Sequence, residues 1–137
     1  MIRLETLLLL AGLCHFGILL ASALVPGVLN WRRELASLAP LSRHVIWTHG
    51  AFIVLIIIAF GALTVTNAAD LAAGSRLARS VCAVISIFWL VRVSLQFFLF
   101  DARPFLRTVF LKIGYHGLTV VFTFMVLVYG WAALKRA

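Results

Sequence analysis

Ionisable and amide side chains inside apolar stretches are the features of this sequence that could carry chemistry. Arg92 and Gln96 lie within residues 80–101, an apolar stretch about as long as a bilayer-spanning helix. An ionised arginine in hydrocarbon costs at least about 2.5 kcal/mol on insertion scales, so Arg92 needs a polar partner, water or a ligand. Spacings of three, four and seven residues return to one side of a helix. The pattern therefore predicts a membrane helix with one polar face, formed by Cys82, Ser86, Trp89, Arg92 and Gln96.

The histidines form the second set of such groups: His15, His44, His49 and His116. At a rise of about 1.5 Å per helical residue, His15 falls near the middle of its apolar stretch. His49 and His116 fall in the same half of the membrane as Arg92, whereas His44 lies at the interface. Neutral imidazoles from different helices are suitable axial ligands for a b-type haem. We therefore predict His49 and His116 as haem-iron ligands, with His15 and His116 as the alternative pair.

The polar face on residues 80–101 would complete such a haem site. Trp89 and Phe88 could wall the macrocycle, and Arg92 or Lys112 could neutralise a propionate. The layout, few membrane helices with several histidines inside them, resembles that of small membrane b-type cytochromes. Haem b would make the chain an electron-transfer subunit of a membrane redox complex. The predicted cofactor-binding residues are His49, His116, His15, Arg92, Trp89 and Gln96.

Two other functions compete with haem binding. In the first, the polar face is structural, since polar contacts between membrane helices contribute about 0.6 kcal/mol each on average. The chain would then be a non-catalytic anchor or accessory subunit of a larger complex. In the second, Arg92 and Lys112 attract an anion in a small transporter or channel, but the short chain has no paired broken helices. A hydrolase is disfavoured because Asp70 and Asp101 lie at or beyond the membrane interfaces.

The two cysteines give no sign of a metal or redox centre. Cys14 and Cys82 each lie inside an apolar stretch, and the sequence contains no CxxC pair. Isolated thiols in such positions usually act as small packing residues.

Composition places the chain in a membrane. It has 137 residues, 64% of them hydrophobic, and a mean hydropathy of +1.14. A soluble domain of this size could not bury so much apolar surface. The formal net charge is +8, and the basic residues flank the apolar stretches, which favours anionic lipid headgroups over nucleic acid as their partner. We expect an integral protein of a bacterial cytoplasmic membrane, in contact with other membrane or redox subunits or with further copies of itself.

Four apolar stretches predict four spans in a single transmembrane domain covering residues 1–137: approximately 5–29, 45–66, 80–100 and 105–134. Their short connections predict an all-α, antiparallel four-helix bundle. Basic residues number six beside the first and third loops and five on the opposite side. This small difference favours a cytoplasmic position for those two loops.

Local signals refine the ends of these helices. The first stretch has features of a signal peptide, but its length favours a spanning helix, which Pro26 should kink or end. Residues Trp31–Leu38 have the pattern of a short amphipathic helix in the headgroup region, capped by Asn30 and stopped by Pro40. Pro104 suits the first turn of the fourth helix.

Overall fold

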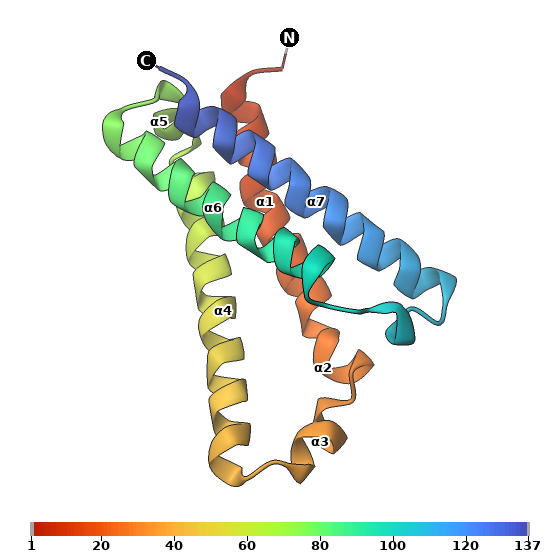
Figure 1. Cartoon of the computed structure of the whole chain (residues 1–137). Helices are drawn as coiled ribbons and strands as arrows, with labels where there is room; N and C mark the ends of the chain where they lie inside the picture. Colours follow the sequence, from red (N-terminus) through yellow and green to blue (C-terminus); the bar gives the residue numbers. More distant parts are fainter. Residues whose placement is uncertain (1, 137) are drawn as a thin grey trace.

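The structure is a computed structural model that describes residues 2–136, and within that range every regular element is helical. Four long helices dominate it: α1 (Leu4–Ala23), α4 (Pro40–Thr66), α6 (Arg76–Phe98) and α7 (Val109–Leu134) (Figure 1). Each is long and apolar enough to cross a membrane, and the first of these spans, Leu4–Val28, includes the short helix that follows α1. The predicted all-α class and the four spans are confirmed, and the chain is a small integral membrane protein.

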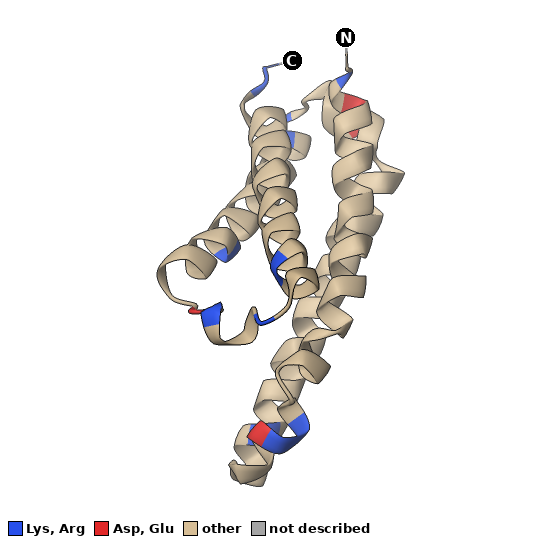
Figure 2. Ribbon diagram, turned by 90° about the vertical axis from the view of Figure 1, so that its right-hand side faces the viewer, with Lys and Arg blue, Asp and Glu red and all other residues tan. Residues whose placement is uncertain are grey.

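The long helices form two packed pairs, α1 with α4 and α6 with α7, and the contact of α1 with α7 joins the pairs. The two chain ends lie at the same end of the bundle, beside α5 (Ala68–Ala73) (Figure 1). From that end α4 diverges from α6, and α4, together with α2 and α3, extends beyond the connection between α6 and α7 (Figures 1 and 2). The bundle is therefore tight at one end and open at the other.

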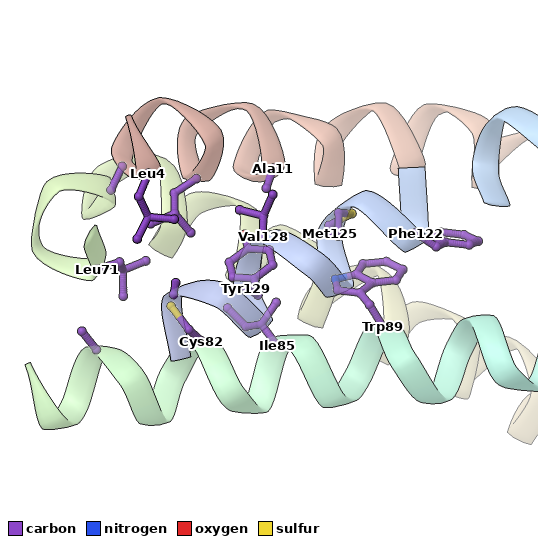
Figure 3. Packing of buried hydrophobic residues seen from close by; sticks show 14 of the residues in the cluster. Leu4, Ala11, Leu71, Cys82, Ile85, Trp89, Phe122, Met125, Val128 and Tyr129 are labelled. Carbon is purple, nitrogen blue, oxygen red and sulfur yellow. The ribbon is translucent and has the colours of Figure 1, made fainter. Parts of the chain in front are cut away.

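Side chains from α1, α6 and α7 meet in the core of the closed half. Trp89, Tyr129 and Met125 are among its largest buried members, and Figure 3 shows them between the helices. In α4, by contrast, the buried residues are confined to its second half: Ile57, Gly61 and Thr64. The first half of α4 takes no part in this core.

Glycines allow α1 and α4 to approach closely. A Cβ atom on Gly12 would lie 2.8 Å from Cγ2 of Val65, and one on Gly61 would lie 3.0 Å from Cβ of His15. Membrane helices gain van der Waals packing where small residues let their backbones approach. Gly12 and Gly61 thus determine how close His15 comes to α4.

The first connection agrees with the predicted interfacial helix and corrects its ends. Helix α1 ends at Ala23 and α2 (Val25–Val28) contains Pro26, as expected. The amphipathic segment is present as α3 (Trp31–Glu34) followed by the 3-10 turn η1 (Leu35–Ser37). The two predicted end signals behave differently: Asn30 makes no side-chain cap and has a left-handed φ of 52°, and Pro40 starts α4 rather than stopping the preceding turn. A proline is well suited to a first helical turn because it has no N–H to leave unpaired there.

The other two connections also differ from the prediction. The second, predicted only as a short connection, contains the helix α5, which is followed by Gly74 with a φ of 79°. In the third, Pro104 belongs to the 3-10 turn η2 (Arg103–Phe105), so its predicted place in the fourth helix is wrong. Helix α7 begins later, at Val109, where the Thr108 hydroxyl accepts a hydrogen bond from the Leu111 amide at 3.2 Å. A threonine N-cap satisfies an otherwise free amide at the helix start.

Candidate functional site: the polar face of the bundle

His15 of α1 is fully buried, and both of its ring nitrogens have partners within the chain. The Trp89 indole N–H of α6 donates a hydrogen bond to Nε2 of His15 at 3.1 Å. Because an indole nitrogen only donates, Nε2 must be the unprotonated nitrogen. The proton therefore lies on Nδ1, which donates to the Ala11 carbonyl at 2.9 Å. These contacts fix a neutral imidazole between α1 and α6.

Aromatic rings surround this pair. The rings of Phe60, Trp89 and Tyr129 all meet the His15 ring edge to face, at centroid distances of 6.2, 5.4 and 5.9 Å. Trp89 also stacks on Phe122 at 5.2 Å. Rings from α4, α6 and α7 thus enclose the imidazole of α1 and exclude water from it.

A second buried bond joins α4 to α7. The Thr64 hydroxyl donates to the Phe60 carbonyl at 2.8 Å. Its proton is thereby committed, so the Tyr129 O–H donates to Oγ1 of Thr64, also at 2.8 Å. Neither Thr64 nor Tyr129 was predicted as a site residue, because a sequence alone does not reveal which membrane tyrosine faces a threonine.

Three further polar contacts tie α6 to α7 along its length. Arg79 Nε donates to the Ala133 carbonyl at 2.9 Å, and the Ser86 hydroxyl donates to the Val126 carbonyl at 3.0 Å. Nearer the open end, the Gln96 amide donates to the hydroxyl of Thr119. The predicted polar face of α6 does turn inward: Cys82, Trp89 and Gln96 are buried, and Ser86 and Arg92 are half-buried.

Arg92 lies on aromatic rings instead of on a polar partner. Its guanidinium carbon is 5.1 Å from the centre of the Phe122 ring and 5.8 Å from that of Phe100. Among residues 2–136, its buried Nη1 has no hydrogen-bond partner. Two nearby polar side chains are engaged elsewhere: Gln96 bonds to Thr119, and Asp101 pairs with Arg103 at 2.9 Å.

The Asp101–Arg103 pair lies at the exposed end of α6. The Arg103 side chain donates to both carboxylate oxygens, and its backbone amide donates to Oδ1 at 3.1 Å. These hydrogen bonds hold the pKa of Asp101 below its usual range and raise the pKa of Arg103. The pair closes the connection between α6 and η2 and is therefore ionised at neutral pH.

A cavity of about 510 Å³ opens between the end of α6, the following connection and the start of α7. Its wall combines polar groups with aromatic rings: Gln96, Phe97, Phe98, Leu99, Phe100, Asp101, Ala102, Arg103, Leu106, Tyr115 and His116. His116 is thus placed on the wall of this cavity, and His49 is not.

The two predicted haem ligands lie on separate surfaces. His49 is exposed on the first half of α4, where its Nδ1 donates to the Val45 carbonyl at 2.8 Å and leaves Nε2 as the free nitrogen. His116 is exposed near the start of α7, and these two parts of the chain lie apart in Figure 1. The pairing of these two histidines on one haem therefore stays a prediction. In the described part of the chain, moreover, no three His, Cys, Asp or Glu side chains gather as a metal site.

Comparisons with protein-family models, with curated proteins and with solved structures found no match. Function is therefore inferred from the side chains of this chain alone.

Proposed function

We propose that the protein is a non-catalytic accessory subunit of a larger membrane complex, with a polar face that holds its own helices together. The observation that carries the proposal is the His15–Trp89 bond. A histidine that acts as a metal ligand or as a general base needs a free ring nitrogen, and His15 has none. Thr64, Tyr129, Ser86 and Gln96 are likewise engaged within the chain.

The first half of α4 supports the second part of the proposal, a partner outside the chain. Phe52 is 61% exposed there, and the polar side chains Thr48 and His49 are also exposed. Polar side chains at membrane depth normally face protein or water rather than lipid. Nε2 of His49 is a free acceptor, which a hydrogen-bond donor on a neighbouring helix would satisfy. We infer that this part of α4 is the surface at which the chain joins its complex.

Cysteine cross-linking in native membranes tests this proposal. Phe52→Cys on α4 should form a cross-link to another membrane protein, because a partner helix lies within reach of its side chain. Val84→Cys, a similarly exposed position on α6, is the matched control and should cross-link weakly. His49→Ala should reduce the Phe52→Cys product. Equal yields at the two positions would contradict a partner surface on α4.

Haem binding is the second candidate, and one observation favours it. The Nδ1 bond of His49 to a backbone carbonyl orients the ring with Nε2 outward, which is the second-shell arrangement common to metal-ligating histidines. Because His49 and His116 lie apart in one chain, a haem at this surface would be shared between copies or with the partner. It would supply one-electron transfer, and the chain would supply axial nitrogens.

An absorption spectrum of the purified complex, oxidised and then reduced with dithionite, tests this candidate. A bis-histidine haem gives a sharp Soret band that shifts on reduction. His49→Ala and His116→Ala should each abolish or alter the spectrum, whereas His44→Ala, at the exposed start of α4, should leave it unchanged. A folded complex without these bands would exclude haem and leave the accessory role.

A further inference from the structure

The starting observation is the unpaired donor of Arg92. Stacking on Phe100 and Phe122 stabilises the positive charge, but it gives no acceptor to the N–H groups of Nη1. Leaving a buried charged donor unpaired is more costly than leaving a neutral one. The structure thus retains an arginine whose buried Nη1 lacks an acceptor oxygen.

Phe100 contacts this guanidinium and also lines the cavity at the end of α6. The guanidinium carbon of Arg92 lies 5.8 Å from the centre of its ring, and Phe100 is also part of the cavity wall. It follows the last turn of α6 and precedes η2, outside any helix, and it is about half exposed. Because Phe100 belongs to both surroundings, a movement of its side chain is the change that would bring the guanidinium and the cavity together.

The surroundings of the cavity favour an anion. Between residues 92 and 116 the sequence has four basic side chains, Arg92, Arg103, Arg107 and Lys112, and Asp101 is the single acid. Asp101 is neutralised by Arg103, so an entering anion meets no free carboxylate there. The Tyr115 hydroxyl and the His116 ring add hydrogen-bonding groups to the wall.

The apolar part of the wall favours an amphiphile. Phe97 and Phe98 line the cavity and are 64% and 90% exposed, on a helix long and apolar enough to span the membrane. Acyl chains can lie along these rings while a headgroup occupies the polar side. A free phosphate ion would instead have to lose its hydration shell beside the same rings.

We propose that this cavity binds an anionic phospholipid, with its phosphodiester held by Arg92 once Phe100 has moved aside. An arginine fork matches two phosphate oxygens, so one headgroup satisfies the donor that the chain leaves unpaired. This inference goes beyond the accessory role and does not depend on it. It assigns a lipid site to the α6–α7 end of the bundle, away from the proposed partner surface on α4.

Native mass spectrometry and thermal unfolding, with phosphatidylglycerol compared with phosphatidylcholine, test the proposal. The wild-type protein should retain phosphatidylglycerol and unfold at a higher temperature in its presence. Arg92→Gln should weaken phosphatidylglycerol binding by about tenfold, the effect expected for loss of a charge-assisted hydrogen bond. Arg32→Gln, which removes the same charge from exposed α3, is the matched control and should leave the binding unchanged. Equal stabilisation by the two lipids, or equal losses in the two variants, would overturn the proposal.

Two further arms separate the remaining possibilities. Inorganic phosphate alone should give no thermal shift, and a shift equal to that of the lipid would overturn the lipid assignment. Phe100→Ala should bind phosphatidylglycerol at least as tightly as the wild type, because the cover is removed. A loss as large as that of Arg92→Gln would overturn the role of Phe100. If Arg92→Gln does not fold, Phe100→Trp keeps Arg92 and enlarges the cover, and unchanged lipid retention in that variant would contradict the route.

Discussion

At the scale of single residues, the bundle tolerates polar groups at membrane depth because each hydrogen bond satisfies both a buried donor and a buried acceptor. The Trp89 indole N–H and His15 Nε2 satisfy each other, and the His15 Nδ1 proton goes to the carbonyl of its own helix. Loss of either partner would leave a buried polar atom unpaired, which costs about 1–3 kcal/mol. Removing one partner should therefore cost more free energy of unfolding than the net contribution of the hydrogen bond itself, because the other partner is left unpaired.

Trp89→Phe tests this dependence. The variant keeps an aromatic ring against Phe122 but leaves Nε2 of His15 without a donor, so we expect the free energy of unfolding to fall by about 1–3 kcal/mol. Trp131→Phe is the matched control, because Trp131 is half exposed on α7, and it should change stability little. Unfolding in mild detergent, followed by circular dichroism, measures both. A second change, His15→Phe, should recover part of the loss, and additive losses would contradict the pairing.

The sequence predicted the polar face of α6 well, and its spacing is the reason. Cys82, Trp89 and Gln96 recur on one side of any helix, whatever surrounds it. The partners were not predictable, because spacing along one helix contains no information on the rotation of its neighbours. Helix α7 turns Tyr115 and Thr119 towards α6 and leaves His116 exposed, so depth in the membrane alone could not identify which groups meet.

At the scale of elements, the contact between α1 and α4 depends on the absence of side chains. A Cβ atom added to Gly12 would meet Val65 and Thr64, whereas one added to Gly17 of the same helix would have no neighbouring atom within 4 Å. The two glycines look equivalent in the sequence. Only the arrangement of the helices shows that one is required by packing and the other is not.

Gly12→Ala should therefore destabilise the protein, while Gly17→Ala should not. The new methyl group on residue 12 would force Val65 and α4 outward, and overpacking of this kind costs about 1–3 kcal/mol. At residue 17 an alanine meets open space and favours the helix by up to about 1 kcal/mol. Unfolding free energies of the two variants, measured in the same detergent, give the comparison. A similar loss at both positions would mean that α1 and α4 do not approach as closely as described.

The sequence also defined element types better than element ends. Apolar length is enough to predict four spanning helices, because a bilayer sets the number of residues needed. Pro40 and Pro104 show the limit of local signals: both are compatible with a first helical turn, yet Pro40 starts α4 and Pro104 lies in a separate 3-10 turn. At the second of these sites Thr108 supplies a better start, since its hydroxyl caps α7.

At the scale of the whole molecule, the bundle is closed at the end that carries both termini and open at the other. All the hydrogen bonds between helices described above involve α1, α6, α7 or the second half of α4. The first half of α4 is held to the chain mainly through the short first connection, where the rings of Trp31 and Trp47 meet edge to face at 5.4 Å. This half is therefore the part of the bundle that is freest to move until something packs against it.

Distances between spin labels test that expectation. One pair of labels, at Phe52 of α4 and Val91 of α6, spans the open half, and a reference pair, at Leu77 of α6 and Trp131 of α7, spans the closed half; all four side chains are exposed. In the isolated chain, double electron–electron resonance should give a broad distance distribution for the first pair of labels and a narrow one for the second. Only the second pair joins helices that are in continuous contact. Addition of the assembled partner should narrow the first distribution, since a helix packed against α4 restricts its angle. Two equally narrow distributions in the isolated chain would show that the open half is rigid without a partner, and the surface of α4 would then be a lipid-facing one.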